Sequence, residues 1–325
     1  MSTALADSGE YIGQSGHSYR IEQVLQEETS PPRRVCLATT GERKFILKYI
    51  HTVNFGDLQE INNRLRGSAN HVRLVQDIIP EKSMFVFEYY ADHLLNLPQK
   101  DLPLKVKKKI LKHALCGIAE LHDQDIVHTG RLHLSQSIDI KPDNVFINWK
   151  DDQDEIIIDQ VKLGDLEDAA HIPPGSHMIG KQVGNWMWRS PEAHAKGPVN
   201  KSSDIFSFAL VCIYVMHKRV IFAIEEEELD EGVDPLAIVI ERQISYFADE
   251  DALNGFLKYL GNNPWVRVFE VIQDGFNKDN PRRPFSLWKG VDNDFKSFIC
   301  AMTNFDPEKR ITAHEALAHK WFEGV

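Results

Sequence analysis

The chain has 325 residues, of which 42% are hydrophobic and 26% are charged, and this composition is typical of a globular protein that buries a large core. Its formal net charge of −11 argues against a nucleic-acid-binding protein, because such proteins carry a basic face. The four cysteines are widely spaced and form no C-x-x-C pair, which argues against a zinc site and favours buried thiols in a reducing compartment.

The N-terminus and the most apolar run of the chain indicate where the protein is found. Residues 1–18 are polar and rich in small residues, so we expect a flexible N-terminal tail and no signal peptide. Residues 205–216 form the most apolar run, which is too short to span a bilayer and predicts a buried core helix. We therefore expect a protein of the cytoplasm or nucleus that makes no membrane contact.

The first part of the chain contains short stretches that are rich in β-branched and aromatic residues, which predicts strands. These stretches are residues 19–25, 34–38, 44–50, 71–75 and 83–90. The amphipathic segment 57–66 predicts a helix between the third and fourth strands. Lys48 lies inside an apolar strand, where a buried charge needs a partner; the alternative is an edge-strand lysine that points to water.

A long helix is predicted at residues 105–123, because apolar residues recur there at helical spacing. After it, the sequence D-I-K-P-D-N occupies residues 139–144. The carboxylate of Asp139 can accept a hydroxyl proton, Lys141 can neutralise a transferring phosphoryl group, and Asn144 offers an oxygen to a hard cation such as Mg²⁺. Proline and aspartate also form turns, so a polar turn without chemistry is the alternative.

Two apolar stretches after this sequence, residues 145–148 and 155–163, predict a pair of strands. The second stretch leads into the sequence G-D-L-E, in which Asp165, taken alone, is typical of a turn residue. Two further motifs follow: G-N-W-M-W-R-S-P-E at residues 184–192 and F-D-P-E-K-R at residues 305–310.

The order and spacing of these motifs resemble those of the protein kinase superfamily, and the lysine two residues after the aspartate resembles its serine/threonine branch. The resemblance covers about residues 19 to 322. It implies an α+β, two-lobed protein-kinase-like fold, with a small β-rich N-lobe and a larger, mainly helical C-lobe. The implied limits are a flexible tail at 1–18, a kinase domain at 19–323, an N-lobe at about 19–90 and a C-lobe at about 91–323.

The resemblance implies transfer of the γ-phosphoryl group of ATP to Ser or Thr hydroxyls of a protein substrate, with ATP and Mg²⁺ as cofactors and the chain as a monomer. Asp139 would orient the hydroxyl and accept its proton, and Lys141 would stabilise the transferring group. Asn144 and Asp165 would hold Mg²⁺. Each of these roles rests on the match to the family's motifs.

The same resemblance implies a nucleotide-binding role for residues of the N-lobe. Lys48 would hold the α- and β-phosphates, and Glu60 on the following helix would be its ion-pair partner. Phe87 would guard the back of the nucleotide pocket. Backbone groups from Glu88 to Tyr90 would bond the adenine, in the segment that leads from one lobe to the other.

Three residues of the C-lobe would have structural roles by this resemblance. Glu192 would form an ion pair with Arg310 and so tie the activation segment to the lower lobe. His128 would pack inside the protein as a structural residue and would not act as a base.

Four features depart from the family pattern. Residues 25–34 contain prolines and glutamates in place of a glycine-rich loop, and these glutamates would repel phosphates. Arg64 stands where an apolar residue is usual, and Glu167 replaces a glycine that can adopt positive φ angles. Residues 130–138 interrupt the catalytic loop, either as a true insertion that lowers the rate or as a splice or gene-model variant. The functional alternatives are an active, divergent serine/threonine kinase and a pseudokinase that acts as a binding or scaffolding module.

Overall fold

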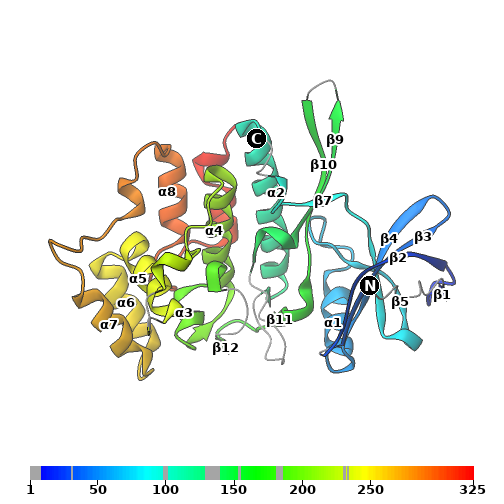
Figure 1. Cartoon of the computed structure of the whole chain (residues 1–325), viewed down its shortest axis with the longest axis horizontal. Coiled ribbons are helices and arrows are strands. Elements are labelled where there is room, and N and C mark those ends of the chain that lie inside the picture. Colours follow the sequence, from blue (N-terminus) through cyan, green and yellow to red (C-terminus); the bar gives the residue numbers. More distant parts are fainter. Residues whose placement is uncertain are drawn as a thin grey trace.

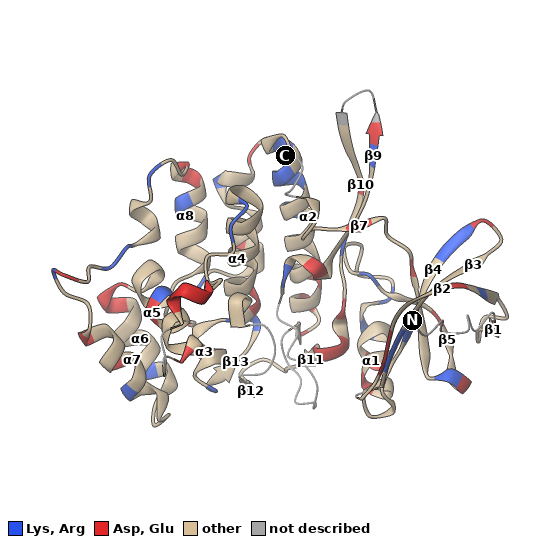
Figure 2. Cartoon of the chain, in the orientation of Figure 1, with Lys and Arg blue, Asp and Glu red and all other residues tan. Residues whose placement is uncertain are grey.

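The computed structural model describes residues 9–30, 32–97, 102–128, 140–152, 155–180, 186–229, 232 and 234–325. A β-rich lobe built from the first part of the chain stands at one end of the molecule, and a larger helical lobe stands at the other (Figure 1). This arrangement confirms the predicted two-lobed α+β architecture. Acidic and basic residues are interspersed over both lobes (Figure 2).

The β-rich lobe contains a six-stranded antiparallel sheet in the order β1-β2-β3-β4-β6-β5. Its strands are β1 (Glu10–Ile12), β2 (Ser18–Thr29), β3 (Pro32–Thr40), β4 (Arg43–Tyr49), β5 (Val75–Ile79) and β6 (Met84–Glu88). Side chains of β3, β4 and β6 such as Ala38, Leu47 and Val86 are buried together and form the core of this lobe. Helix α1 (Thr52–Leu65) follows β4.

The structure corrects the expected extent of the flexible tail. Residues 1–8 lie outside the described residues, but Glu10–Ile12 forms β1 and pairs with the start of β2. The loop between these strands is held to β5, since the backbone N–H of Ser15 donates to Oδ1 of Asp77 over 3.1 Å. The first sheet therefore begins at Glu10, inside the segment 1–18 that was expected to be a flexible tail.

The strand predicted at residues 71–75 is also wrong in its limits, because β5 begins only at Val75. The preceding segment pairs with the end of another strand instead. The backbone N–H of Arg73 donates to the carbonyl oxygen of Leu163, and the N–H of Leu163 donates to that of His71, both over 2.7 Å. These bonds hold residues 71–73 against the end of strand β10.

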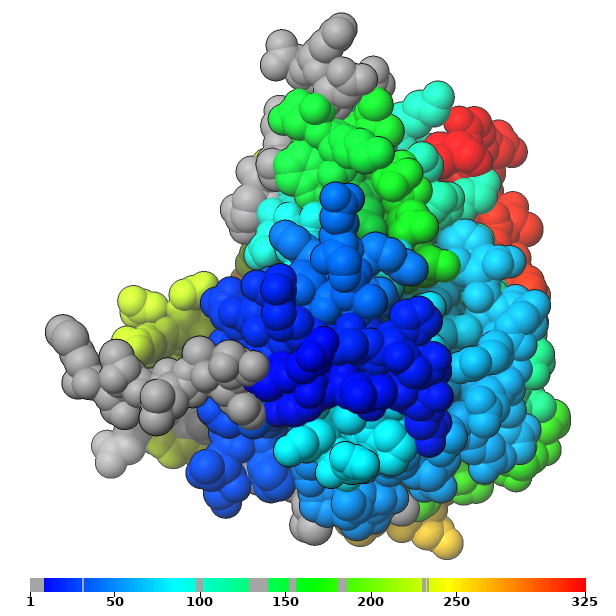
Figure 3. Space-filling view, turned by 90° about the vertical axis from the view of Figure 1, so that its right-hand side faces the viewer, coloured from blue at the N-terminus to red at the C-terminus, as the bar shows by residue number. Residues whose placement is uncertain are grey.

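A second sheet, in the order β10-β9-β7, lies between the β-rich lobe and the helical lobe (Figure 1). Its strands are β7 (Asp92–His93), β9 (Val145–Asp152) and β10 (Glu155–Leu163). The two longer strands form a hairpin that projects from the molecule in Figure 1, and Figure 3 shows this green hairpin above the blue strands of the first sheet. β9 begins directly after Asn144, and β10 ends just before Asp165, so the hairpin places both predicted metal ligands at one end.

In the part of the chain that the structure describes, the larger lobe contains helices and four short strands. The helices are α2 (Leu104–Asp123), α3 (Pro191–His194), α4 (Lys201–His217), α5 (Pro235–Phe247), α6 (Glu250–Leu260), α7 (Trp265–Asp274), α8 (Asn293–Met302) and α9 (Ala313–Leu317). The strands are β8 (Ile126–Val127), β11 (Ala170–His171), β12 (Met178–Ile179) and β13 (Pro198–Val199). Among the described helices, none is both long and apolar enough to cross a membrane.

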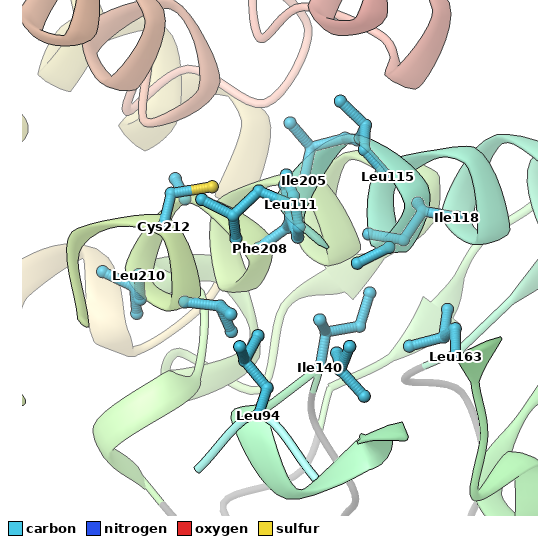
Figure 4. Close-up of a cluster of buried hydrophobic side chains, with 14 of the residues drawn as sticks. Leu94, Leu111, Leu115, Ile118, Ile140, Leu163, Ile205, Phe208, Leu210 and Cys212 are labelled. Carbon is cyan, nitrogen blue, oxygen red and sulfur yellow. The ribbon is translucent and has the colours of Figure 1, made fainter. Parts of the chain in front are cut away.

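Helices α2 and α4 form the centre of the larger lobe. The segment 205–216 lies within α4, and its side chains are buried up to residue 215, which confirms the predicted core helix. Side chains of α2 such as Leu111 and Leu115 pack near Phe208 of α4, and Ile140 and Leu163 belong to the same buried cluster (Figure 4). This core therefore fixes the strands and loops that carry the predicted catalytic residues.

The four cysteines are free thiols in different environments. Cys36 and Cys212 are buried, as predicted, whereas Cys116 is half-buried and Cys300 is exposed. The expectation of buried thiols is thus correct for two of the four.

Candidate active site

A cleft with a volume of about 810 Å³ lies between the two lobes. Its lining includes the apolar side chains of Val35, Ile46 and Phe146 and the charged side chains of Lys48 and Asp165. The cleft therefore combines apolar surface, which suits an aromatic base, with charged groups, which suit phosphates or a metal ion.

Lys48 lies on β4 and lines the cleft. Its Nζ atom lies 2.7 Å from Oδ1 of Asp165, and it also forms an ion pair with Glu167. The three side chains remain between 19% and 26% exposed, so water and a ligand can reach them. Burial alone would lower the pKa of Lys48, but the two carboxylates raise it above its usual value, so the lysine stays charged.

Glu60 does not belong to this group. Its side chain is 63% exposed and lies 2.8 Å from the guanidinium of Arg64, one turn further along α1. The expected ion pair between Lys48 and Glu60 is therefore wrong for this structure, in which both residues are described. The residues of α1 that line the cleft are Leu58 and Asn62, and Glu60 and Arg64 do not line it.

The burial pattern of α1 explains this difference. Its buried positions are Leu58, Ile61, Asn62 and Leu65. The side chain of Asn62 is satisfied inside the protein, because its amide nitrogen donates to the Leu58 carbonyl over 2.8 Å and its oxygen accepts from the Val75 N–H over 2.9 Å. The buried face of α1 thus includes Asn62, and Glu60 and Arg64 point toward solvent. Arg64 therefore does not replace an apolar core residue.

Asp165 and Glu167 lie on one turn after β10. Asp165 has a φ of 60° and a ψ of 59°, and Leu166–Asp168 form the short 3₁₀ helix η4. The left-handed residue is thus Asp165, a type that tolerates this conformation, and the strain expected for Glu167 does not arise. Leu166 is buried in the main core and fixes the turn.

The ionisation of this turn fits a magnesium ion. Burial by itself raises the pKa of Asp165, but the charge of Lys48 and its hydrogen bond lower it below its usual value, so Asp165 is a carboxylate. Burial raises the pKa of Glu167 against the attraction of Lys48. The carbonyl oxygen of Asn144 accepts a hydrogen bond from the Gly164 N–H over 2.8 Å, which places Asn144 beside the turn. A carboxylate with an amide oxygen nearby is a donor set that suits Mg²⁺.

The structure describes the catalytic loop from Ile140 onward. Asp139, the predicted proton acceptor, and the interrupting residues 130–138 lie outside the described residues. Lys141 lines the cleft, and its Nζ atom lies 3.4 Å from Oδ2 of Asp143. Lys141 and Asp165 are therefore brought to the same cleft, as predicted.

His128 connects the catalytic loop to its surroundings. It is fully buried, its backbone N–H donates to Oδ2 of Asp204 over 2.9 Å, and its Nε2 atom lies 2.9 Å from the Gly164 carbonyl oxygen. Nε2 of His122 lies 2.9 Å from the same Asp204 oxygen. These contacts confirm that His128 is a structural residue, because it joins α4 to the turn that carries Asp165.

The predicted ion pair between Glu192 and Arg310 is confirmed. Their side chains are 0% exposed, and two nitrogen–oxygen distances of 2.7 and 3.2 Å make the pair bidentate. The hydroxyl of Ser203 also donates to Glu192 over 2.7 Å. Helix α3 is thereby fixed to the start of α4 and to the segment before α9.

A β-hairpin takes the place of the glycine-rich loop, since β2 extends to Thr29 and β3, which pairs with it, begins at Pro32. Opposite charges face each other across it: Arg33 lies 4.0 Å from Glu28, and Arg34 lies 3.7 Å from Glu27. Arg33 also lines the cleft. The repulsion expected from the two glutamates is therefore offset by arginines of the neighbouring strand, although such partly exposed pairs are weak.

The side chain of Arg73 contacts the hinge at the end of β6, a contact that sequence reasoning missed. The guanidinium of Arg73 donates two hydrogen bonds to the carbonyl oxygen of Glu88, from Nε over 3.1 Å and from Nη2 over 2.5 Å. Phe87 and Tyr90 lie where expected, beside the cleft. The side chain of Glu88 is not among the residues that line it. A charge inside the apolar sequence H-V-R-L-V was the available signal for Arg73, as it was for Lys48.

Comparisons with known proteins agree with this architecture. The chain matches the protein kinase domain model over residues 35–322. It is 27% identical over 290 residues to Serine/threonine-protein kinase SSN3 of Mycosarcoma maydis, and the alignment covers 82% of this chain and 37% of that protein. It is 25% identical over 268 residues to a probable cyclin-dependent serine/threonine-protein kinase of Dictyostelium discoideum, and the alignment covers 80% of this chain and 17% of that protein. This chain thus spans well under half the length of these two relatives.

A solved structure shares the fold. A chain in the crystal structure of the yeast RNA Pol II CTD kinase CTDK-1 complex superposes with a TM-score of 0.71 at 17% identity, and the match covers 100% of this chain and 97% of that chain. The match to the family model over most of the sequence carries the conclusion on the family. The chain belongs to the protein kinase domain family.

Proposed function

We propose that this chain transfers the γ-phosphoryl group of ATP to Ser or Thr hydroxyls of a protein substrate, in the cytoplasm or nucleus. The observation that carries the proposal is the ion pair of 2.7 Å between Lys48 and Asp165 in a cleft that Lys141 and Asn144 also line. The choice of Ser or Thr rests on Lys141, whose position resembles that branch, and on the names of the relatives. A monomer remains our expectation.

The described residues divide the work between binding and charge stabilisation. Lys48 would bond the α- and β-phosphates, and Lys141 would stabilise the negative charge of the transferring group. Asn144 and Asp165 would hold Mg²⁺, which neutralises phosphate charge when bound. Asp139, which lies outside the described residues, would accept the proton of the substrate hydroxyl.

Glu167 would act as the positioning residue for Lys48, a role expected of Glu60. A lysine that must meet phosphates needs an anionic neighbour that fixes its side chain, and Glu167 is paired with Lys48 while Glu60 is paired with Arg64. The glutamate at the glycine position would then be a functional replacement for the helix glutamate.

A pseudokinase is the second candidate, and the hairpin at residues 25–34 favours it. Side chains of this hairpin line the cleft where a glycine-rich loop would offer bare backbone N–H groups to phosphates. Such a protein would keep the fold and the cleft but would transfer no phosphate.

A radiolabel assay separates these functions. Wild-type protein is incubated with labelled ATP, Mg²⁺ and a generic basic protein, beside Lys48→Met, Asp139→Asn and the control Lys44→Met, which changes an exposed lysine of the same strand. We expect transfer by wild type and Lys44→Met, and a loss of about 100-fold or more in the other two variants. Equal transfer by all four proteins, or none by wild type, would contradict an active kinase.

A further inference from the structure

Arg73 lines the cleft and is held there by its own backbone. It lies between α1 and β5, and its N–H donates to the carbonyl oxygen of Leu163 over 2.7 Å. Leu163 is the last residue of β10 and is fully buried in the cluster that includes side chains of α2 and α4, so this anchor belongs to the main core. From there the side chain of Arg73 reaches the carbonyl of Glu88, at the start of the hinge.

Two donors of Arg73 use the hydrogen-bonding capacity of this carbonyl. A carbonyl oxygen has two lone pairs, and this one accepts two hydrogen bonds from the guanidinium, from Nε over 3.1 Å and from Nη2 over 2.5 Å. By resemblance, backbone groups from Glu88 to Tyr90 are those that would bond the adenine. The acceptor at the start of this segment is therefore already in use.

The guanidinium also lies among the aromatic side chains of the same region. Its central carbon is 4.3 Å from the ring centroid of Phe146, 5.1 Å from that of Phe87 and 5.7 Å from that of Tyr90. Phe146 lies on β9, and all three aromatic residues line the cleft. A cation is attracted to such ring faces, and a planar guanidinium covers surface on which a flat base would stack.

Within the described part of the chain, Arg73 forms no ion pair with a carboxylate. Burial lowers its pKa to about 10, so the guanidinium is still protonated at neutral pH. Its charge is thus stabilised by one carbonyl oxygen and three aromatic rings. A guanidinium has five N–H donors, and the Glu88 carbonyl accepts from two of its nitrogens. Donors that are not bonded to Glu88 can serve a ligand that brings a hydrogen-bond acceptor.

We propose that Arg73 determines which base the cleft accepts, because it disfavours adenine and favours a purine with a carbonyl oxygen at position 6. The 6-amino group of adenine donates hydrogen bonds, and the acceptor it would use is the carbonyl oxygen of Glu88. That oxygen already accepts from Arg73, so the amino group would face a guanidinium, which is also a donor. A 6-oxo group is an acceptor, and arginine commonly donates to the O6 atom of guanine. Adenine would bind only when the Arg73 side chain turns away. The inference rests on the nucleotide-dependent function proposed above.

The test compares the affinities of two nucleotides in matched variants. Dissociation constants for ATP and GTP with Mg²⁺ are measured by titration calorimetry for wild type, Arg73→Leu and Arg73→Lys, with the folded state checked by thermal unfolding. Arg66→Leu is the control, because Arg66 also donates to a backbone carbonyl, that of Val75 at 3.3 Å, and is not among the residues that line the cleft. Arg73→Lys keeps the charge but loses the planar pair of donors, and serves if the leucine variant is unstable.

We expect Arg73→Leu to raise ATP affinity and lower GTP affinity, so that the ratio of the two constants shifts toward ATP by about tenfold or more. Arg73→Lys should shift the ratio in the same direction, and Arg66→Leu should leave it unchanged. Measurable binding with the same ratio in wild type and both Arg73 variants would overturn this inference and leave the proposed function standing. Absence of nucleotide binding in every variant would overturn both.

Discussion

The buried ion pair of the lower lobe and the charged group of the cleft differ in exposure and in balance. Glu192 and Arg310 are sealed from water, and their single charges cancel. Lys48, Asp165 and Glu167 are each about a quarter exposed or less, and one ammonium faces two carboxylates. A sealed and balanced pair holds elements together, whereas an accessible group with an excess negative charge is suited to a metal ion that brings phosphates.

The largest effect that follows from this contrast is on stability. Arg310→Ala would leave Glu192 charged and buried without its bidentate partner, which costs about 3–5 kcal/mol. Denaturant unfolding of wild type and variant measures this loss. Arg267→Ala is the control, since its pair with Glu270 is exposed and should contribute almost nothing. A loss below about 1 kcal/mol for Arg310→Ala would show that the buried pair stabilises the protein no more than an exposed ion pair does.

The next effect concerns pH, and it comes from His194 on α3, beside the sealed pair. Burial, reinforced by the charge of Arg189, holds the pKa of His194 well below its usual value. Below about pH 6.5 the unfolded chain therefore binds a proton at this histidine that the folded chain does not bind. The free energy of unfolding should fall with decreasing pH by up to about 1.4 kcal/mol per pH unit from this residue.

Replacement of this histidine isolates its contribution. His194→Phe should unfold with a shallower dependence on pH between about 7 and 5, because one proton fewer is taken up on unfolding. Urea titrations at several pH values give the slopes of both proteins. An unchanged slope would mean that His194 is protonated as easily in the folded chain as in the unfolded one.

A smaller effect concerns the β-rich lobe. The hydroxyl of Tyr19 donates to Oδ2 of Asp77 over 3.0 Å inside the sheet, and burial with this hydrogen bond raises the pKa of Tyr19 to about 12. Tyr19→Phe should cost about 1 kcal/mol, because Asp77 keeps its bonds to Ser15. Chemical unfolding measures the loss, and Tyr49→Phe, on the same sheet, should change stability by less than about 0.5 kcal/mol. Equal losses in the two variants would show that the bond to Asp77 does not stabilise the lobe.

Sequence reasoning predicted well the elements whose signals are local. The long helix α2, the hairpin strand β10 and the buried α4 all appear where apolar spacing placed them. The pairing of Glu192 with Arg310 was also expected, because their motifs resemble those that the kinase family pairs.

The errors arose where rotation or side-chain reach decides the contact. Glu60 was paired with Lys48 by resemblance to the family, but the rotation of α1 buries Leu58, Ile61, Asn62 and Leu65 and directs Glu60 toward Arg64 at the surface. Glu167 was treated as a defect because its partner, Lys48, lies more than a hundred residues away in the sequence. Arg73 was missed because its contacts are made by a long side chain whose direction no spacing predicts.

The central claim is that Glu167, and not Glu60, positions Lys48, and steady-state kinetics with ATP test it most directly. The account predicts that Glu167→Gln lowers kcat/KM for ATP by about tenfold or more, roughly 1.4 kcal/mol, and that Glu60→Gln stays within about twofold of wild type. Glu167→Gly, which restores the glycine of the family, should also lose activity. Equal melting temperatures would show that the folded state is unaffected. A loss in Glu60→Gln with no loss, or a gain, in the two Glu167 variants would contradict the account.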